Sequence, residues 1–205
     1  FPQTAWNVIY LSNEFLDKKI KIDNNDYDNK NIKKNIYRSR YPKFMGWEYI
    51  KEHINKEYDI IFYCDVNTKL NVDLNWQNFA KSIINNESGI MQSQHPCKNT
   101  IIMDINAISK FNIDNINKTY NFLKKNNADF NYKICQNNIF GYNPKNEKIL
   151  SAFTTFWDIY TTKKLTYRDQ PLWGYISWKL NIKPVYNNNL CESWKELAKF
   201  ANPPW

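Results

Sequence analysis

Residues 57–71, EYDIIFYCDVNTKLN, join an apolar run to an acid and an amide. Five of the six residues from Ile60 to Asp65 are apolar, aromatic or cysteine, and the run continues into Asp65-Val66-Asn67. A short apolar run that ends in turn-forming residues predicts a strand over 58–64, and apolar residues on both faces favour a central position in a sheet. Two interpretations of its polar end stay open. It is a turn, or it is a pair of oxygen ligands for a divalent cation.

Around this strand the hydrophobic spacing alternates between helical and extended patterns. Helices are predicted at 46–54, 75–86, 113–127, 147–162 and 168–180, and further strands at 6–11, 89–95, 138–144 and 182–188. The polar segment 17–35 is interpreted as a short strand with an excursion, or as a mobile loop. We therefore expect an α/β fold: one domain over 1–205, with a central, mostly parallel mixed sheet flanked by helices.

Composition limits the partners. The net charge of +8 permits nucleic acid, an anionic surface or a phosphorylated small molecule, but the lysines are dispersed, so no stable nucleic-acid partner is expected. No segment of eighteen apolar residues occurs, so no membrane span is expected. The four cysteines form no C-x-x-C pair, which argues against zinc and for reduced thiols in the cytoplasm. Because the chain begins at Phe1, a segment upstream of it is left open.

A second motif, YRDQPLWGY at 167–175, places Asp169 two residues before Pro171. Asp is a good N-cap and Pro suits a first helical turn, so Asp169 is predicted at a helix start. There an ionised carboxylate is stabilised by the helix dipole and can act as a general base. The alternative is an ordinary capping residue.

Two further segments carry candidate binding residues. YRSRYPKF at 37–44 supplies Arg38, Arg40 and Lys43, whose side chains suit phosphate oxygens or form a solvated basic face. His95, in SQHP at 93–96, follows a predicted strand, so it lies on the ligand edge of the sheet or is structural.

The order of these motifs resembles a GT-A-type glycosyltransferase domain. The segments are the basic stretch with Lys43, IIFYCDVN, QHP, an aromatic helix and YRDQPLWGYISWKLNIKP. The resemblance covers about residues 6–187 and is greatest to the DUF616-type group of plants and bacteria and to a capsid-glycan glycosyltransferase of chlorella viruses. The Arg-Asp-Gln that opens a helix is its most specific element.

The resemblance implies a metal-dependent enzyme that moves a sugar from a nucleotide-sugar donor to a glycan acceptor. Asp65 and Asn67 would take the place of an Asp-x-Asp motif that holds Mn²⁺ or Mg²⁺, with one carboxylate fewer. Asp169 would be the base of an inverting reaction. The donor-contacting residues would be Arg38, Arg40, Lys43, Asp65 and Asn13, and the residues near the acceptor or donor sugar would be His95, Arg168, Gln170 and Trp173, with Trp173 stacking on a sugar ring. UDP-linked rhamnose is the first expected donor and UDP-glucose the second. The expected location is the cytoplasm, that of the host if the chain is viral.

Two other functions stay open. A sugar-nucleotide nucleotidyltransferase shares the acidic strand end and the metal, but it normally has a Gly-rich phosphate loop, and only Gly46 precedes the strand. A non-catalytic module for sugar or nucleic acid would use the positive charge and exposed aromatics. The product distinguishes the three, because transfer releases a nucleoside diphosphate, nucleotidyl transfer releases pyrophosphate, and a module turns nothing over.

Overall fold

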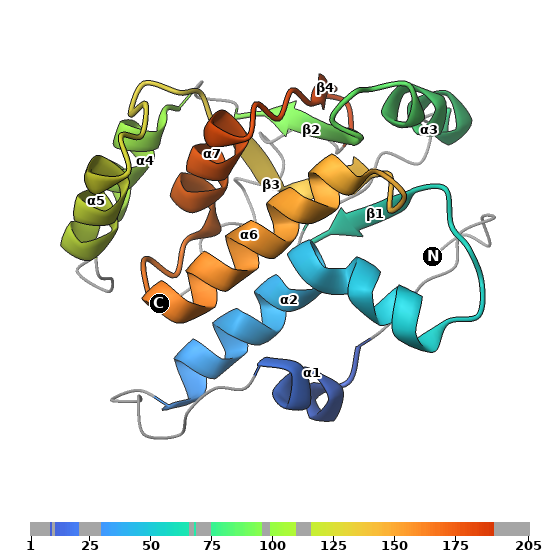
Figure 1. The fold of residues 1–205 in the computed structure, drawn as a ribbon, viewed down its shortest axis with the longest axis horizontal. Coiled ribbons are helices and arrows are strands. Elements are labelled where there is room, and N and C mark those ends of the chain that lie inside the picture. The colour runs from blue at the N-terminus through green and yellow to red at the C-terminus, as the bar shows by residue number, and fades with distance from the viewer. Residues whose placement is uncertain are drawn as a thin grey trace.

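The structure is a computed structural model that describes residues 9, 11–20, 30–65, 68, 75–95, 99–109 and 116–190. Within these ranges seven helices accompany one four-stranded sheet, which is a mixed α/β architecture (Figure 1). The helices are α1 Asn13–Ile20, α2 Lys30–His53, α3 Trp76–Ile84, α4 Ile101–Ser109, α5 Ile116–Lys125, α6 Glu147–Lys163 and α7 Asp169–Lys179. The strands are β1 Ile61–Cys64, β2 Ile90–Gln94, β3 Cys135–Tyr142 and β4 Val185–Tyr186.

The described sheet is mixed but mostly antiparallel, so the predicted mostly parallel sheet is wrong. The strand order is β1-β3-β2-β4. β3 runs antiparallel to both β1 and β2, and only β2 and β4 are parallel. β1 and β2 do run in the same direction, as alternating helices and strands suggest. The later strand β3 inserts between them in the opposite direction, and periodicity carries no information about such an insertion.

β1 is an edge strand of the described sheet, which corrects the prediction of a central position. Its apolar residues are covered by side chains rather than by a second neighbouring strand. Phe62 packs edge-on against Trp76 at 5.0 Å between ring centroids, and Tyr63 lies 5.6 Å from Phe140. Gly141, opposite Phe62 in the register, leaves room for this ring, because a Cβ there would lie 2.4 Å from it.

The main core lies between the sheet and helices α2, α6 and α7. An aromatic group at its centre consists of Phe44, Phe140, Phe153, Phe156 and Trp173, with neighbouring rings 4.0 to 6.1 Å apart. A smaller cluster that includes Ile83 of α3, Met91 and Ile139 forms a separate group. The sheet edge is thereby held rigidly against α2 and α7.

Helix α2 is longer than predicted, because it continues through Pro42. Sequence reasoning placed only residues 46–54 in this helix. A proline inside a helix removes a backbone hydrogen bond. Tertiary packing compensates, because Tyr41, Phe44 and Met45 are all buried in the main core. Figure 1 shows that α2 changes direction midway.

Other boundaries also differ. Helices α1 and α4 were not predicted. Of the segment 17–35, interpreted as a strand with an excursion or as a loop, residues 17–20 belong to α1 and residues 30–35 to α2, and the remainder lies outside the described residues. The predicted strand at 6–11 lies mostly outside the described residues. Within the described ranges, no helix combines the length and the apolar character that crossing a membrane requires.

Candidate functional site

The carboxyl ends of β1 and β2 meet at one edge of the sheet. Both strands run opposite to β3, so Asp65 and His95, which follow them, lie beside the amino-terminal half of β3. The Asp65 N–H donates to the carbonyl of Asn138 over 2.7 Å. Ligands of open α/β sheets bind at such an edge.

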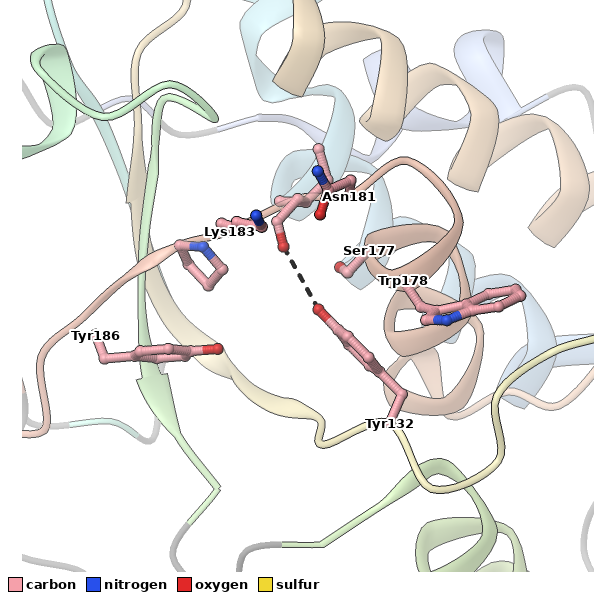
Figure 2. Close-up of a pocket in the computed structure, with 8 residues that line it drawn as sticks. Tyr132, Ser177, Trp178, Asn181, Lys183 and Tyr186 are labelled. Atoms are coloured by element: carbon pink, nitrogen blue, oxygen red, sulfur yellow. Dashed lines mark hydrogen bonds between the residues drawn. The ribbon is translucent and has the colours of Figure 1, made fainter.

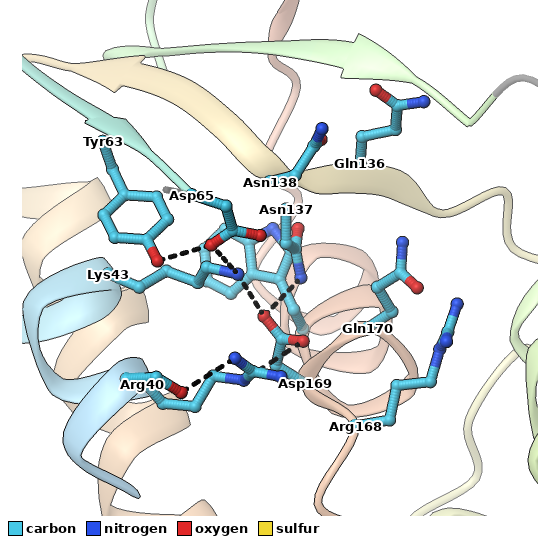
Figure 3. A network of polar contacts seen from close by, with 12 residues as sticks. Arg40, Lys43, Tyr63, Asp65, Gln136, Asn137, Asn138, Arg168, Asp169 and Gln170 are labelled. Carbon is cyan, nitrogen blue, oxygen red and sulfur yellow. Dashed lines mark hydrogen bonds and ion pairs between the residues drawn. The ribbon is translucent and has the colours of Figure 1, made fainter. Parts of the chain in front are cut away.

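Asp169 is the first residue of α7, and Arg168 occupies the N-cap position without a side-chain capping bond. The predicted helix start is therefore correct, and the capping position lies one residue earlier. The Asp169 side chain is 4% exposed and points into a polar cluster between α2, β1 and β3 (Figure 3).

Two cations from α2 meet Asp169 there. Lys43 Nζ lies 3.2 Å from Asp169 Oδ2 and 3.5 Å from Asp65 Oδ1, and Arg40 Nε lies 3.5 Å from Asp169 Oδ1. Lys43 is only 2% exposed. A buried ammonium is costly unless it is paired, so Lys43 requires these carboxylates. We call Arg40, Lys43, Asp65 and Asp169 the charged cluster.

The charges in this cluster fix its protonation. Burial alone would raise the pKa of Asp169, but Lys43 and Arg40 outweigh burial and hold that pKa at about 2. In return, Asp169 raises the pKa of Arg40. Tyr63 donates a 2.5 Å hydrogen bond to Asp65 Oδ1, and burial, with Asp65 beside it, raises the pKa of Tyr63. At neutral pH the Asp169 side chain is therefore an ionised carboxylate, Arg40 is a cation, and Tyr63 beside the cluster is a neutral phenol.

Behind Asp169 a chain of hydrogen bonds leads into the core. Asn137 Nδ2 donates to Asp169 Oδ2 over 3.3 Å, and Gln92 Nε2 donates to Asn137 Oδ1 over 3.2 Å. Trp173 Nε1 then donates to Gln92 Oε1 over 3.3 Å. Sequence reasoning missed Asn137 and Gln92. Amides inside otherwise buried strands were the signal that could have identified them.

Trp173 does not fit the expected stacking role. Its side chain is 2% exposed and packs on Phe44 and Phe153 inside the core. A ring in this position has no free face for a sugar. Its structure-based role is to anchor the hydrogen-bond chain that ends on Asp169.

Arg168 and Gln170 flank Asp169 and are held by other elements. Arg168 Nε lies 3.0 Å from Asp104, a fully buried residue of α4. Burial raises the pKa of Asp104, and Arg168 opposes that effect. Gln170 Nε2 donates to the Cys135 carbonyl over 3.4 Å. Asp104 was missed because its helix was not predicted.

His95 lies at the same edge of the sheet. Burial lowers its pKa, and the nearby charge of Arg168 adds to this effect. His95 is therefore a neutral imidazole at neutral pH, which can both donate and accept a hydrogen bond.

Not every predicted site residue reaches the cluster. Arg38 lies two residues before Arg40 but pairs with Asp17 of α1 through two 2.8 Å hydrogen bonds. Asn13 is exposed at the start of α1. Asn67, the second predicted metal ligand, lies outside the described residues.

The described residues contain no group of three His, Cys, Asp or Glu side chains that could hold a metal ion. Asp65 contributes one carboxylate, and within the same residues only its Oδ1 is engaged, by Tyr63 and Lys43. A single protein carboxylate suits an ion that arrives with phosphate oxygens of a ligand better than an ion in a complete protein cage.

The chain was also compared with known proteins. No family model, no curated protein and no solved structure matches it.

Proposed function

We propose that the chain is a glycosyltransferase that moves a sugar from a nucleotide-sugar donor to a hydroxyl of a glycan acceptor, with inversion. The observation that carries the proposal is the charged cluster. Two cations and two carboxylates, separated by up to 126 residues in the chain, meet at the end of the sheet where β1 and β2 finish, with Lys43 and Asp169 buried and Arg40 and Asp65 partly exposed. Cations for a diphosphate and a carboxylate for a hydroxyl are the groups that this reaction requires.

The donor diphosphate is assigned to Lys43 and Arg40. Arg40 Nε is buried and makes an ion pair at 3.5 Å but no hydrogen bond within the described residues, so it keeps a donor for a phosphate oxygen. Asp65, with Asn67, is assigned to Mn²⁺ or Mg²⁺. When bound, the ion neutralises charge on the departing diphosphate. UDP-linked rhamnose and UDP-glucose are the first donors to test.

Asp169 is assigned as the base. It takes the proton of the acceptor hydroxyl as that oxygen bonds to the anomeric carbon, and the electron pair of the broken bond stays on the diphosphate. With a pKa of about 2, Asp169 is a weak base while Lys43 and Arg40 contact it. When Lys43 and Arg40 turn toward a bound diphosphate, they stabilise the Asp169 carboxylate less, and Asp169 becomes a stronger base. His95, Arg168 and Gln170 are assigned to hydroxyls of the bound sugars.

The first experiment measures UDP binding by calorimetry with and without Mn²⁺, with GDP as the comparison. We expect Mn²⁺ to strengthen UDP binding, and Asp65→Ala to remove that dependence. Asp59→Ala is the matched control, because Asp59 is an exposed carboxylate that pairs with Lys145 at the surface. Equal binding with and without the metal in the unchanged protein would refute the metal assignment.

A second experiment measures the product. We expect nucleoside diphosphate release from a UDP-sugar with an acceptor glycan, and Asp169→Asn to abolish release while UDP binding persists. Circular dichroism must show that the variant is folded. A fully active Asp169→Asn would eliminate the mechanism. Release of pyrophosphate would identify a nucleotidyltransferase instead.

A further inference from the structure

A site separate from the charged cluster lies at the opposite end of α7 from Asp169. It is a pocket of about 510 Å³ between the end of α7, the loop that follows it and β4 (Figure 2). The six residues that carry the argument are Tyr132, Ser177, Trp178, Asn181, Lys183 and Tyr186. The function proposed above uses none of them.

Hydrogen bonds hold the wall of this pocket in place. Ile182 N–H donates to the Ser177 carbonyl over 2.8 Å, and Lys183 N–H donates to Ser88 Oγ over 2.9 Å. Tyr132 OH donates to the Ile182 carbonyl over 3.4 Å, across the pocket in Figure 2. A wall fixed in this way is formed before a ligand binds, which lowers the entropic cost of binding.

One polar group in the pocket is unsatisfied. Ser177 is 6% exposed, lines the pocket, and its Oγ has no hydrogen-bond partner among the described residues. A buried hydroxyl without a partner costs free energy that a ligand hydroxyl can recover. Tyr186, which lines the same pocket, is 52% exposed, so its ring is accessible to a ligand.

We propose that this pocket binds a neutral pyranose ring, as an additional subsite for the acceptor glycan. A pyranose has an apolar face that packs on aromatic rings and hydroxyls that both donate and accept hydrogen bonds. Tyr132, Trp178 and Tyr186 supply rings, and Ser177, Asn181 and Lys183 supply polar groups. None of the lining residues is a carboxylate, so the pocket does not suit a metal ion.

Cys135 connects this pocket to the charged cluster. Its carbonyl accepts a hydrogen bond from Gln170, next to Asp169, and its thiol meets the Tyr186 side chain. Through Cys135, Gln170 beside Asp169 is thus linked to Tyr186 of the pocket. The acceptor role of the subsite rests on the proposed function, but sugar binding in the pocket does not.

The test is therefore a binding experiment without donor and without turnover. Cellobiose, maltose, chitobiose and L-rhamnose are titrated into the full chain, with uridine as the comparison, and indole and amide NMR signals are followed. We expect at least one saccharide to shift the signals of Trp178 and Tyr186. Tyr186→Ala and Ser177→Ala should each weaken that binding by about fivefold.

Tyr120→Ala is the matched control, because Tyr120 is also a partly exposed aromatic residue but lies on α5. It should leave saccharide binding unchanged. The proposal is overturned if no saccharide shifts these signals, if uridine shifts them instead, or if all three variants weaken binding equally. Failure of UDP binding in the calorimetric test would leave these outcomes unaffected.

Discussion

Both ends of α7 bury polar side chains, but the two ends differ in whether those side chains have bonding partners. At the amino end, Asp169 is 4% exposed and contacts Lys43, Arg40 and Asn137. At the carboxyl end, Ser177 is 6% exposed and has no hydrogen-bond partner within the described residues. The buried carboxylate of Asp169 and the buried hydroxyl of Ser177 therefore have different roles. The buried polar group at the amino end has partners within the chain, whereas the hydroxyl at the carboxyl end has none among the described residues and is the group that we propose a ligand contacts.

The largest effect should come from removing the acid at the amino end. Asp169→Ala leaves Lys43 buried without its nearest partner and should lower the free energy of unfolding by about 3 to 5 kcal/mol. Ser177→Ala removes a group with no partner and should change it by less than about 0.5 kcal/mol. Urea denaturation of both variants at neutral pH measures the difference. Equal losses would mean that the two ends do not differ.

Between the two ends of α7, acid should reduce the stabilising contribution of the amino end only. The pKa of Asp169 in the folded protein, about 2, lies below its ordinary value of 3.8, so its stabilisation is complete above about pH 4. It should be lost as the pH falls toward 2, which costs about 2 kcal/mol. Urea midpoints from about pH 5 to about pH 2.5 measure this loss. Asp169→Asn should flatten the profile in that window, and an unchanged profile would contradict the assigned pKa.

The two arginines of α2 allow a further comparison, between a buried and a surface ion pair. Arg40 faces the buried Asp169, so Arg40→Ala should lower the free energy of unfolding by about 2 kcal/mol. Arg38 pairs with Asp17 near the surface, and Arg38→Ala should lower it by much less. Chemical denaturation of the two variants provides the ranking, and the reverse order would show that the charged cluster contributes little to stability.

A small effect is also expected for a second buried acid near the amino end. Burial raises the pKa of Asp104, so its ionised form is disfavoured in the fold, in contrast to Asp169. Asp104→Asn should therefore change the free energy of unfolding by less than about 1 kcal/mol. Thermal unfolding measures it. A loss as large as that of Asp169→Ala would show that Asp104 and Arg168 hold α4 on α7 as tightly as the charged cluster holds α2.

These contrasts also show what local sequence can predict. Helix α6 was predicted because apolar residues recur along it at helical spacing. Helix α7 is buried on almost all sides, and it was predicted from its apolar residues together with Pro171, which also placed Asp169 at the helix start. Asp65 was placed at the end of a strand because turn-forming residues follow β1 directly. Each of these features depends on neighbours within a few residues.

Features that depend on distant packing were not predictable in this way. Helix α2 continues through Pro42 because Tyr41, Phe44 and Met45 are buried against other elements. The antiparallel insertion of β3 also depends on packing between distant elements. The same is true of the different partners of Arg38 and Arg40. Local reasoning identified the residue types of the charged cluster, but only the fold decided which arginine reaches Asp169.

Lys43 and Asp169 lie 126 positions apart in the chain, which constrains the order in which the charged cluster can form. A ribosome releases α2 long before it releases α7. Until then Lys43 has Asp65 as a carboxylate partner but lacks the nearer Asp169, so the burial of its ammonium is only partly compensated. The charged cluster therefore forms late in synthesis, and the aromatic residues that surround Lys43 need protection from aggregation until α7 arrives.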